Sequence, residues 1–263
     1  MTARRVSRIG SLSEYRVVST LHLVPEDLRD LYEVREWRNA AGVLSTAYPA
    51  EWADIQAVLR SFKLPKSQIL AAGGNRSDLS KAFDGPFTKR GWIEKLFRTG
   101  IKLDETTIES PTHKIDCYKN HVALEIEWNN KDPFFDRDLE NFKRLHADGA
   151  ISLGVIITRG AALQDGLKQL VHRFADEATV NSFVDVERIG LSPTRRQRTD
   201  VMKRVERRLN PVPFRDAWVD GFVGDKFGAS TTHWRKLEDR VQRGVGNPCP
   251  LLLIGLPASV VTD

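Results

Sequence analysis

The pattern of hydrophobic and polar residues predicts strands and helices that alternate along the chain. In VALEIEW, residues 122–128, apolar side chains alternate with acids, as in a strand whose two faces differ. Apolar residues then recur at helical spacing in RDLENFKRLHAD, 137–148, a helix that Asp136 is expected to cap and Gly149 to end. The continuously apolar run AISLGVIIT, 150–158, is typical of a strand buried on both faces. This order favours a right-handed crossover within a mixed or parallel sheet.

The remaining elements extend the same pattern. Strands are expected over 15–23, 91–97, 112–118 and 249–256, helices over 25–40, 49–62, 162–175, 199–209 and 230–244, and a glycine-rich loop entering a helix over 71–83. The predicted fold class is therefore α/β, with a central mixed β-sheet flanked by helices and peripheral decorations. Because no internal repeat or low-complexity tract divides the chain, residues 1–263 are expected to form a single domain.

Composition narrows the class only a little. The 263 residues are 41% hydrophobic and 29% charged, as in ordinary globular proteins, and the net charge is +5. Residues 188–208 hold eight Lys or Arg against two acids, a run that suits either a DNA groove or a solvated helix face. Two distant cysteines predict neither disulfides nor zinc and favour the reducing cytoplasm. No apolar run is long enough for a membrane span, and no membrane partner is expected.

The strands before and after Lys119–Asn120 form a predicted hairpin that gathers acids on one face. We place the turn at these two residues, which sets Asp116 opposite Ala123. Because side chains alternate along a strand, Glu125 and Glu127 lie on the same face as Asp116, with Asp116 diagonal to Glu125. A loop of two or four residues keeps this arrangement, whereas a three-residue loop moves the acids to opposite faces.

Three carboxylates on one face repel one another unless a cation lies between them. Mg²⁺ accepts one or two carboxylates and keeps several waters, so the face suits a hard divalent cation. A cation there lowers the pKa of a bound water and stabilises charge that develops on a phosphate. The alternative is a solvated sheet face, on which alternating acids are common. The spacing alone leaves both interpretations open.

The acids stand within a wider pattern. Asp116 and the triplet Glu125–Ile126–Glu127 are separated by eight residues, and WNNKD, FDRDL and GVIITR follow. GGNRSD, GWIEK, STTHWRKL and CPLLLIGL agree with it, from about residue 65 onward. The combination resembles the restriction endonucleases of the BglII and BstYI type, within the PD-(D/E)XK nuclease superfamily.

This resemblance implies a restriction-endonuclease-like core over approximately 65–175, with 176–263 completing the fold and the DNA-binding surface. It implies a type II restriction endonuclease, a homodimer that hydrolyses duplex DNA with Mg²⁺ at a short palindromic site, with GATC at its centre. A matching DNA methyltransferase is the expected functional counterpart. The outer bases, the methylation sensitivity and the dimer surface stay open.

The resemblance also assigns roles at the hairpin. Asp116 and Glu125 would hold the metal, with the backbone carbonyl of Ile126 as a further ligand, and Asp116, Glu125 and Glu127 form the catalytic set. Glu127 occupies the position at which the superfamily usually has Lys, so its role is open. It would orient the attacking water, act as a base, or bind a second metal.

Candidate DNA contacts occur in three loops. Asn can bond a purine edge and Lys reaches guanine or phosphate, so Asn130 and Lys131 after the acidic strand are candidates; a plain turn is the alternative. The loop at 75–77 offers backbone N–H groups at a helix start, and Ser230 and Thr231 lie at another helix entrance. Helix capping explains these two loops equally well on sequence alone. The loop candidates are Asn75, Arg76, Ser77, Ser230 and Thr231.

Three other functions are alternatives to site-specific cleavage. A related nuclease in DNA repair would use the same acids and cut by DNA structure, leaving no fixed sequence at the ends. A non-catalytic DNA-binding module on this fold is disfavoured because all three acids are present. A carbohydrate hydrolase is more distant still, since no aromatic sugar platform accompanies the acids.

Overall fold

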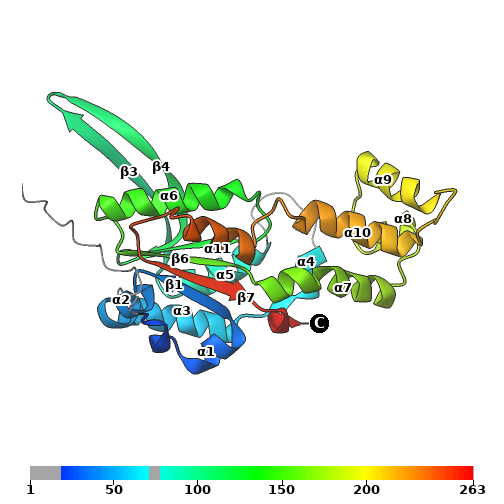
Figure 1. Cartoon of the computed structure of the whole chain (residues 1–263), viewed down its shortest axis with the longest axis horizontal. Coiled ribbons are helices and arrows are strands. Elements are labelled where there is room, and N and C mark those ends of the chain that lie inside the picture. Colours follow the sequence, from blue (N-terminus) through cyan, green and yellow to red (C-terminus); the bar gives the residue numbers. More distant parts are fainter. Residues whose placement is uncertain (1–18, 71–77, 263) are drawn as a thin grey trace, which may run out of the picture.

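A computed structural model of the chain describes residues 19–70 and 78–262, and it contains a six-stranded mixed sheet in the order β1-β7-β6-β5-β4-β3. The strands are β1 (Glu33–Trp37), β3 (Ile93–Leu103), β4 (Thr106–Lys119), β5 (Val122–Glu127), β6 (Leu153–Arg159) and β7 (Leu251–Leu256). Neighbours β5, β6 and β7 are parallel, and the other pairs are antiparallel. A small second sheet pairs β2 (Leu64–Pro65) with β8 (Val261–Thr262). Figure 1 shows helices on both faces of the large sheet, which confirms the predicted α/β class.

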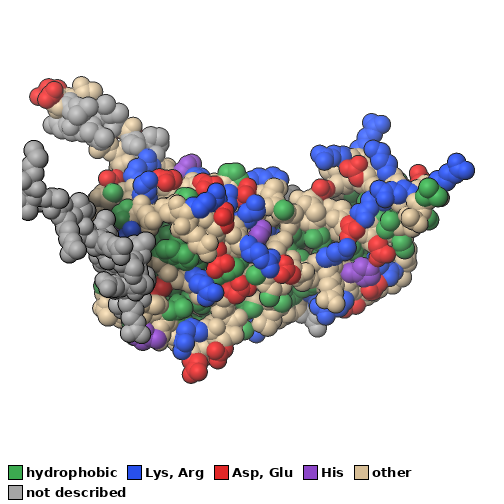
Figure 2. Space-filling model, in the orientation of Figure 1, with side chains coloured by type: hydrophobic (Ala, Val, Ile, Leu, Met, Phe, Trp, Pro, Cys, Tyr) green, Lys and Arg blue, Asp and Glu red, His purple; other side chains and the backbone are tan. Residues whose placement is uncertain are grey.

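Two parts extend from this sheet (Figure 1): the long hairpin of β3 and β4, and a helical end formed by α7, α8, α9 and α10. The helices of the chain are α1 (Glu26–Leu31), α2 (Ala40–Ala47), α3 (Pro49–Ser61), α4 (Lys66–Leu70), α5 (Asp78–Thr88), α6 (Pro133–Ala147), α7 (Ala161–Glu177), α8 (Phe183–Arg188), α9 (Arg195–Val205), α10 (Phe214–Phe227) and α11 (Trp234–Gln242), with 3-10 turns at Leu21–Leu23 and Ala258–Val260. Lys and Arg side chains gather over the helical end (Figure 2). No helix among the described residues has the length and apolar character that crossing a bilayer requires.

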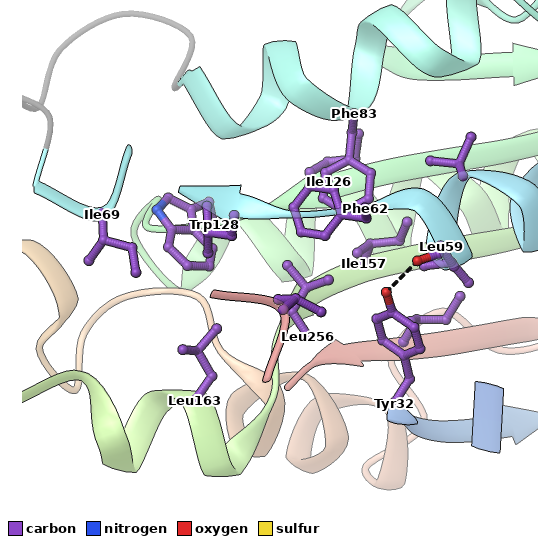
Figure 3. Close-up of a cluster of buried hydrophobic side chains, with 14 of the residues drawn as sticks. Tyr32, Leu59, Phe62, Ile69, Phe83, Ile126, Trp128, Ile157, Leu163 and Leu256 are labelled. Atoms are coloured by element: carbon purple, nitrogen blue, oxygen red, sulfur yellow. Dashed lines mark hydrogen bonds between the residues drawn. The ribbon is translucent and has the colours of Figure 1, made fainter. Parts of the chain in front are cut away.

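The sheet separates two hydrophobic cores because its central strands alternate. Val122, Leu124, Ile126 and Trp128 pack with α3, α5 and α7 on one side, as the sequence predicts; Figure 3 shows Ile126 and Trp128 among these side chains. Ala123 and the apolar stripes of α6 and α11 form the other core. α6 approaches β6 so closely that a Cβ at position 154 would lie 2.3 Å from the Phe142 ring. Glycine therefore lets this helix lie against the strand beside the acids.

Several predicted boundaries are wrong. The helix expected over 25–40 ends at Leu31, and Glu33–Trp37 is instead the edge strand β1, paired with Leu251–Gly255 of β7. The described part of the strand expected at 15–23 holds only the 3-10 turn Leu21–Leu23. α6 begins three residues before the predicted cap Asp136, with Asp132 as its N-cap and Pro133 in the first turn.

The basic helix predicted over 199–209 is shifted toward the N-terminus. Observed α9 starts at Arg195, because Thr194 and Gln197 form a capping box, and it ends at Val205. Leu209, expected to face inward, lies beyond the helix and is 81% exposed. The sequence pattern did not reveal α10, which connects this helix with the loop before α11.

Candidate active site

The turn between β4 and β5 lies one residue later than predicted. Its two loop residues are Asn120 and His121, which both have positive φ, 43° and 66°, as a tight hairpin turn with the twist of its strands requires. The register therefore pairs Tyr118 with Ala123, and its continuation places Asp116 opposite Glu125 rather than opposite Ala123. A loop of two residues was predicted and is present, so the acids stay on one face.

Backbone amides tie two of these acids together. The amide of Asp116 donates to Glu125 Oε2 at 3.2 Å, and the amide of Ile126 donates to Asp116 Oδ2 at 3.1 Å. Glu125 and Glu127 are each 2% exposed. The alternative of a solvated acidic face is therefore wrong for these two glutamates, which are buried at the centre of the molecule.

A fourth carboxylate joins the cluster from α6. Asp138 is fully buried, and its Oδ1 accepts from Arg137 Nε at 2.8 Å and lies 2.7 Å from Nη2. The same guanidinium lies 3.6 Å from Glu127 Oε1, and Asn130 Nδ2 donates to Glu127 Oε2 at 2.8 Å. Asp138 was not predicted from the sequence. The sequence does indicate it, because this acid interrupts the apolar stripe that α6 buries.

The pKa values of Glu125, Glu127 and Asp138 are raised, first by burial. Burial raises the pKa of Glu125 well above its ordinary value, and the charges of Asp138 and Asp116 raise it further. Burial and then Asp138 raise the pKa of Glu127, against the hydrogen bond from Asn130. Burial also raises the pKa of Asp138, although Arg137 opposes this. Arg137 alone does not balance so many acids, and a further cation would let them ionise.

The donor atoms here fit a hard divalent cation. Carboxylate oxygens are the ligands that Mg²⁺ prefers, and two carboxylates suffice when waters complete the shell. Oε1 of buried Glu125 has no hydrogen-bond partner among the described residues, so it is available as a ligand. Within the described ranges, no three His, Cys, Asp or Glu side chains already stand in a metal-holding arrangement. A cation bound here would therefore draw on two carboxylates, with waters completing its shell.

Two of the predicted DNA-contact loops, far apart in the sequence, form one edge beside the acids. Lys131 and Thr231 form an antiparallel bridge. The amide of Asp132 donates to the Ser230 carbonyl at 2.9 Å, and the amide of Thr232 donates to the Asn130 carbonyl at 2.8 Å. We call residues 129–132 and 230–232 the paired edge. The side chains of Asn130, Lys131 and Ser230 are exposed on it.

Thr231 differs from its neighbours on the paired edge. It is only 2% exposed, and its hydroxyl donates to the Gly228 carbonyl at 2.8 Å while accepting from Arg159 Nη2 at 2.7 Å. Its side chain is thus used within the protein. Asn75, Arg76 and Ser77 lie outside the described residues.

Arg159, the last residue of β6, is hydrogen-bonded to the paired edge. It is fully buried, and its Nη2 also donates to the Thr232 carbonyl at 2.5 Å. The guanidinium lies against the rings of both Trp128 and Phe227, 5.5 and 4.9 Å from their centroids. Burial lowers its pKa to about 9. Arg159 ends the motif GVIITR, but no role was predicted for it from the sequence.

The whole chain was compared with known protein families and with curated proteins. The chain matches the family model described as Restriction endonuclease BglII/BglIII over residues 32–256, which include the sheet, the four acids and the paired edge. None of the individually curated proteins matches it. The match covers most of the chain and confirms the resemblance seen in the sequence motifs. The chain therefore belongs to the restriction endonuclease BglII/BglIII family and is a type II restriction endonuclease, a site-specific deoxyribonuclease that acts on double-stranded DNA.

Proposed function

We propose that this enzyme hydrolyses DNA with Mg²⁺ held by Asp116, Glu125 and the backbone carbonyl of Ile126. The observation that carries the proposal is the buried Glu125 carboxylate, which is tied to Asp116 through the backbone and keeps one oxygen without a partner. When bound, Mg²⁺ would stabilise negative charge on the phosphate and lower the pKa of a bound water.

Glu127 is the third residue of the proposed catalytic set. Asn130 and Arg137 hold its carboxyl group in place, and its raised pKa makes it a better proton acceptor than an ordinary carboxylate. We assign it to the attacking water, which would approach the phosphorus in line with the leaving oxygen. As the bond between the phosphorus and the leaving oxygen breaks, that oxygen takes up a proton. Orientation of the water, proton acceptance and binding of a second cation are the alternatives for Glu127.

We further propose that the paired edge reads DNA. Asn130, Lys131 and Ser230 present exposed polar groups to base edges or phosphates, whereas Thr231 holds the edge in place. Asn75, Arg76 and Ser77 remain proposed DNA contacts. We infer a palindromic site with central GATC cut by a homodimer, and a single endonuclease domain spanning 1–263. In the cell we place the enzyme in the cytoplasm, with a matching DNA methyltransferase that protects host DNA.

Glu125→Gln tests the proposed metal site, since it keeps the shape of the side chain and removes its charge. We expect cleavage of unmethylated plasmid with Mg²⁺ to fall at least about 100-fold, while binding of a duplex without metal is retained. Isothermal titration with Mn²⁺ should show weaker metal binding in the variant. Unchanged Mn²⁺ binding together with full cleavage would exclude the assignment.

The DNA site is tested separately by sequencing the ends of plasmid fragments. Discrete bands with a shared central GATC at the cut ends are expected. Ends without a common sequence would contradict the proposed recognition site. Analytical ultracentrifugation with a palindromic duplex tests the homodimer, because one duplex should then bind two chains.

A further inference from the structure

The positive charge of the enzyme is concentrated in one short segment. Residues 195–208, which we call the basic arm, contain seven Lys or Arg and two acids, a net +5. The whole chain also has a net charge of +5, so the remaining residues sum to zero. Figure 2 shows the Lys and Arg side chains gathered at the end of the molecule that carries α9.

The basic arm is held firmly against the rest of the helical end. Val201 is buried, Gln197 Nε2 donates to Asp225 Oδ2 at 3.0 Å, and Arg204 Nη2 lies 2.5 Å from Asp220 Oδ2. Arg198 pairs with Glu187. Two of the seven cations therefore fasten the arm to its neighbours.

The other cations of the basic arm face solvent. Arg196 meets only Asp200 of its own helix, at 3.6 Å, and its side chain is 88% exposed. Four more are exposed and have no ion pair with any residue that the structure describes: Arg195, Lys203, Arg207 and Arg208. A fixed helix with exposed cations along it and two more just beyond its end is suited to a polyanion, because little ordering of the helix is needed when the anion binds.

The arm begins beside the paired edge and leads away from it. Asp225, the partner of Gln197, lies five residues before Ser230, whereas Arg204 contacts Asp220 farther back along α10. A cavity of about 450 Å³ lies between the two parts, lined by Lys131 on one side and by Gln197 and Arg204 on the other. The 11 residues of α9 span about 16 Å, close to the rise of about five base pairs.

We propose that the basic arm binds the phosphates of duplex DNA flanking the recognition site. The enzyme already acts on duplex DNA, and the arm places its unpaired cations along a path that continues outward from the paired edge. Contacts to phosphates fix position and affinity without reading sequence. The proposal rests on the activity of the family and is independent of the roles proposed for Asp116, Glu125 and Mg²⁺.

The test compares two cognate duplexes without divalent metal, one ending about two base pairs beyond the site and one extending about ten base pairs on each side. The variant combines Arg196→Gln, Lys203→Gln and Arg207→Gln. We expect it to bind the long duplex about 10- to 100-fold more weakly and the short duplex with unchanged affinity. On the long duplex, the dependence of log K on log salt should become shallower by about 2 to 3.

A matched control removes the same charge outside the basic arm, through Arg29→Gln in α1, Lys63→Gln after α3 and Lys89→Gln after α5. A second variant keeps the charge in the arm, through Arg196→Lys, Lys203→Arg and Arg207→Lys, and should bind like the wild type. If the arm variant and the control lose equal affinity for the long duplex, net charge alone acts and the proposal is wrong. The proposal is also wrong if the arm variant loses equal affinity for both duplexes, or loses none. An unchanged melting temperature of the variant rules out misfolding.

Discussion

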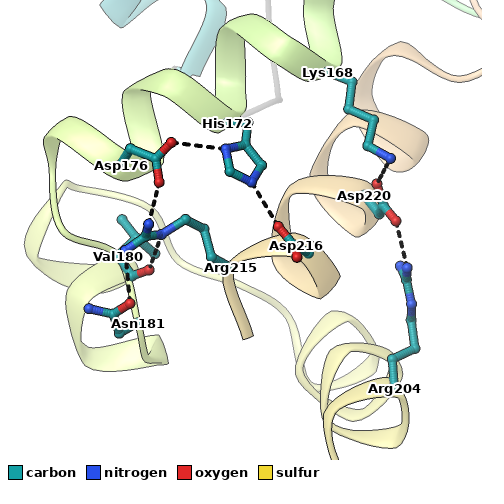
Figure 4. Close-up of polar contacts among 9 residues, drawn as sticks. All are labelled: Lys168, His172, Asp176, Val180, Asn181, Arg204, Arg215, Asp216 and Asp220. Carbon is teal, nitrogen blue, oxygen red and sulfur yellow. Dashed lines mark hydrogen bonds and ion pairs between the residues drawn. The ribbon is translucent and has the colours of Figure 1, made fainter. Parts of the chain in front are cut away.

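The acid cluster beside β5 and the helical end of the molecule both gather charged side chains, but in opposite ways. At the helical end, His172 lies between Asp176 and Asp216, at 3.0 and 2.7 Å, and Asp220 accepts from Lys168 and Arg204 (Figure 4). Each of these acids has a cationic partner and stays partly exposed. Their interactions fasten α10 to α7 and α9.

In the acid cluster, buried charges lack matching partners. Among the described residues, Glu125, Glu127 and Asp138 share the cation Arg137, and the buried cation Arg159 donates hydrogen bonds to Thr231 and Thr232 and has no carboxylate partner there. Burying a charge without a counter-charge lowers stability, so a stable fold keeps such groups only where something else requires them. The comparison teaches that the paired charges of the helical end stabilise structure, whereas the acids beside β5, which lack such pairing, are the residues that we propose for DNA cleavage.

Arg159→Met should have the largest effect on stability, because it removes both hydrogen bonds that Arg159 donates to the paired edge. We expect a loss of about 1–3 kcal/mol in the free energy of unfolding, since Thr231 and Thr232 lose a buried donor. Cleavage should fall about 10- to 100-fold, and cutting at sites with one wrong base should rise relative to the cognate site. Rates on cognate and near-cognate duplexes measure this, together with thermal melting.

Tyr32→Phe is the matched control for Arg159→Met. It removes another buried hydrogen bond, from the Tyr32 hydroxyl to the Leu59 carbonyl at 2.7 Å, in the core that α3 covers. The expected cost is about 1 kcal/mol with unchanged cleavage specificity. If Arg159→Met likewise lowers stability without changing the preference for the cognate site, Arg159 supports the fold and not recognition.

The same chemical change should have opposite effects in the two regions. Asp138→Asn removes a charge whose pKa is raised, so we expect the metal-free protein to become more stable by about 1 kcal/mol while cleavage falls. Asp220→Asn removes a charge whose pKa its basic neighbours Lys168 and Arg204 lower, so stability should fall by about 0.5–1 kcal/mol with cleavage retained. Urea unfolding of both variants without metal gives the two signs, and equal signs would contradict the contrast between the regions.

Sequence alone predicted the acidic face but not its full membership. Asp116, Glu125 and Glu127 share a face for any even loop, because alternation along a strand does not depend on the register. The register itself could be assigned only from the backbone conformation of Asn120 and His121. Their positive φ values were not predicted from the residue types. Asp138 joins the acids only because α6 lies across the sheet.

Long-range pairing accounts for the other differences. Glu33–Trp37 reads as helix locally and becomes a strand because β7, at the other end of the sequence, offers it a free sheet edge. Lys131 and Thr231 were both predicted as DNA contacts, yet nothing in either loop indicates that they pair. The family resemblance supplied the function from motifs, whereas the joint edge and its support by Arg159 required the folded chain.

His172→Gln should have the smallest effect, and it tests whether paired charges do stabilise the helical end. The hydrogen bond to Asp216, with that to Asp176, raises the pKa of His172 above its ordinary value of about 6.5. Its stabilisation is therefore fully present below about pH 6.5 and is lost as the pH rises through the higher pKa of the folded state. Because the side chain is 37% exposed, solvent screening limits the difference to under about 1 kcal/mol. Melting temperatures of wild type and variant should differ at pH 6 and converge at pH 9, and a constant difference would show that His172 acts through packing rather than charge.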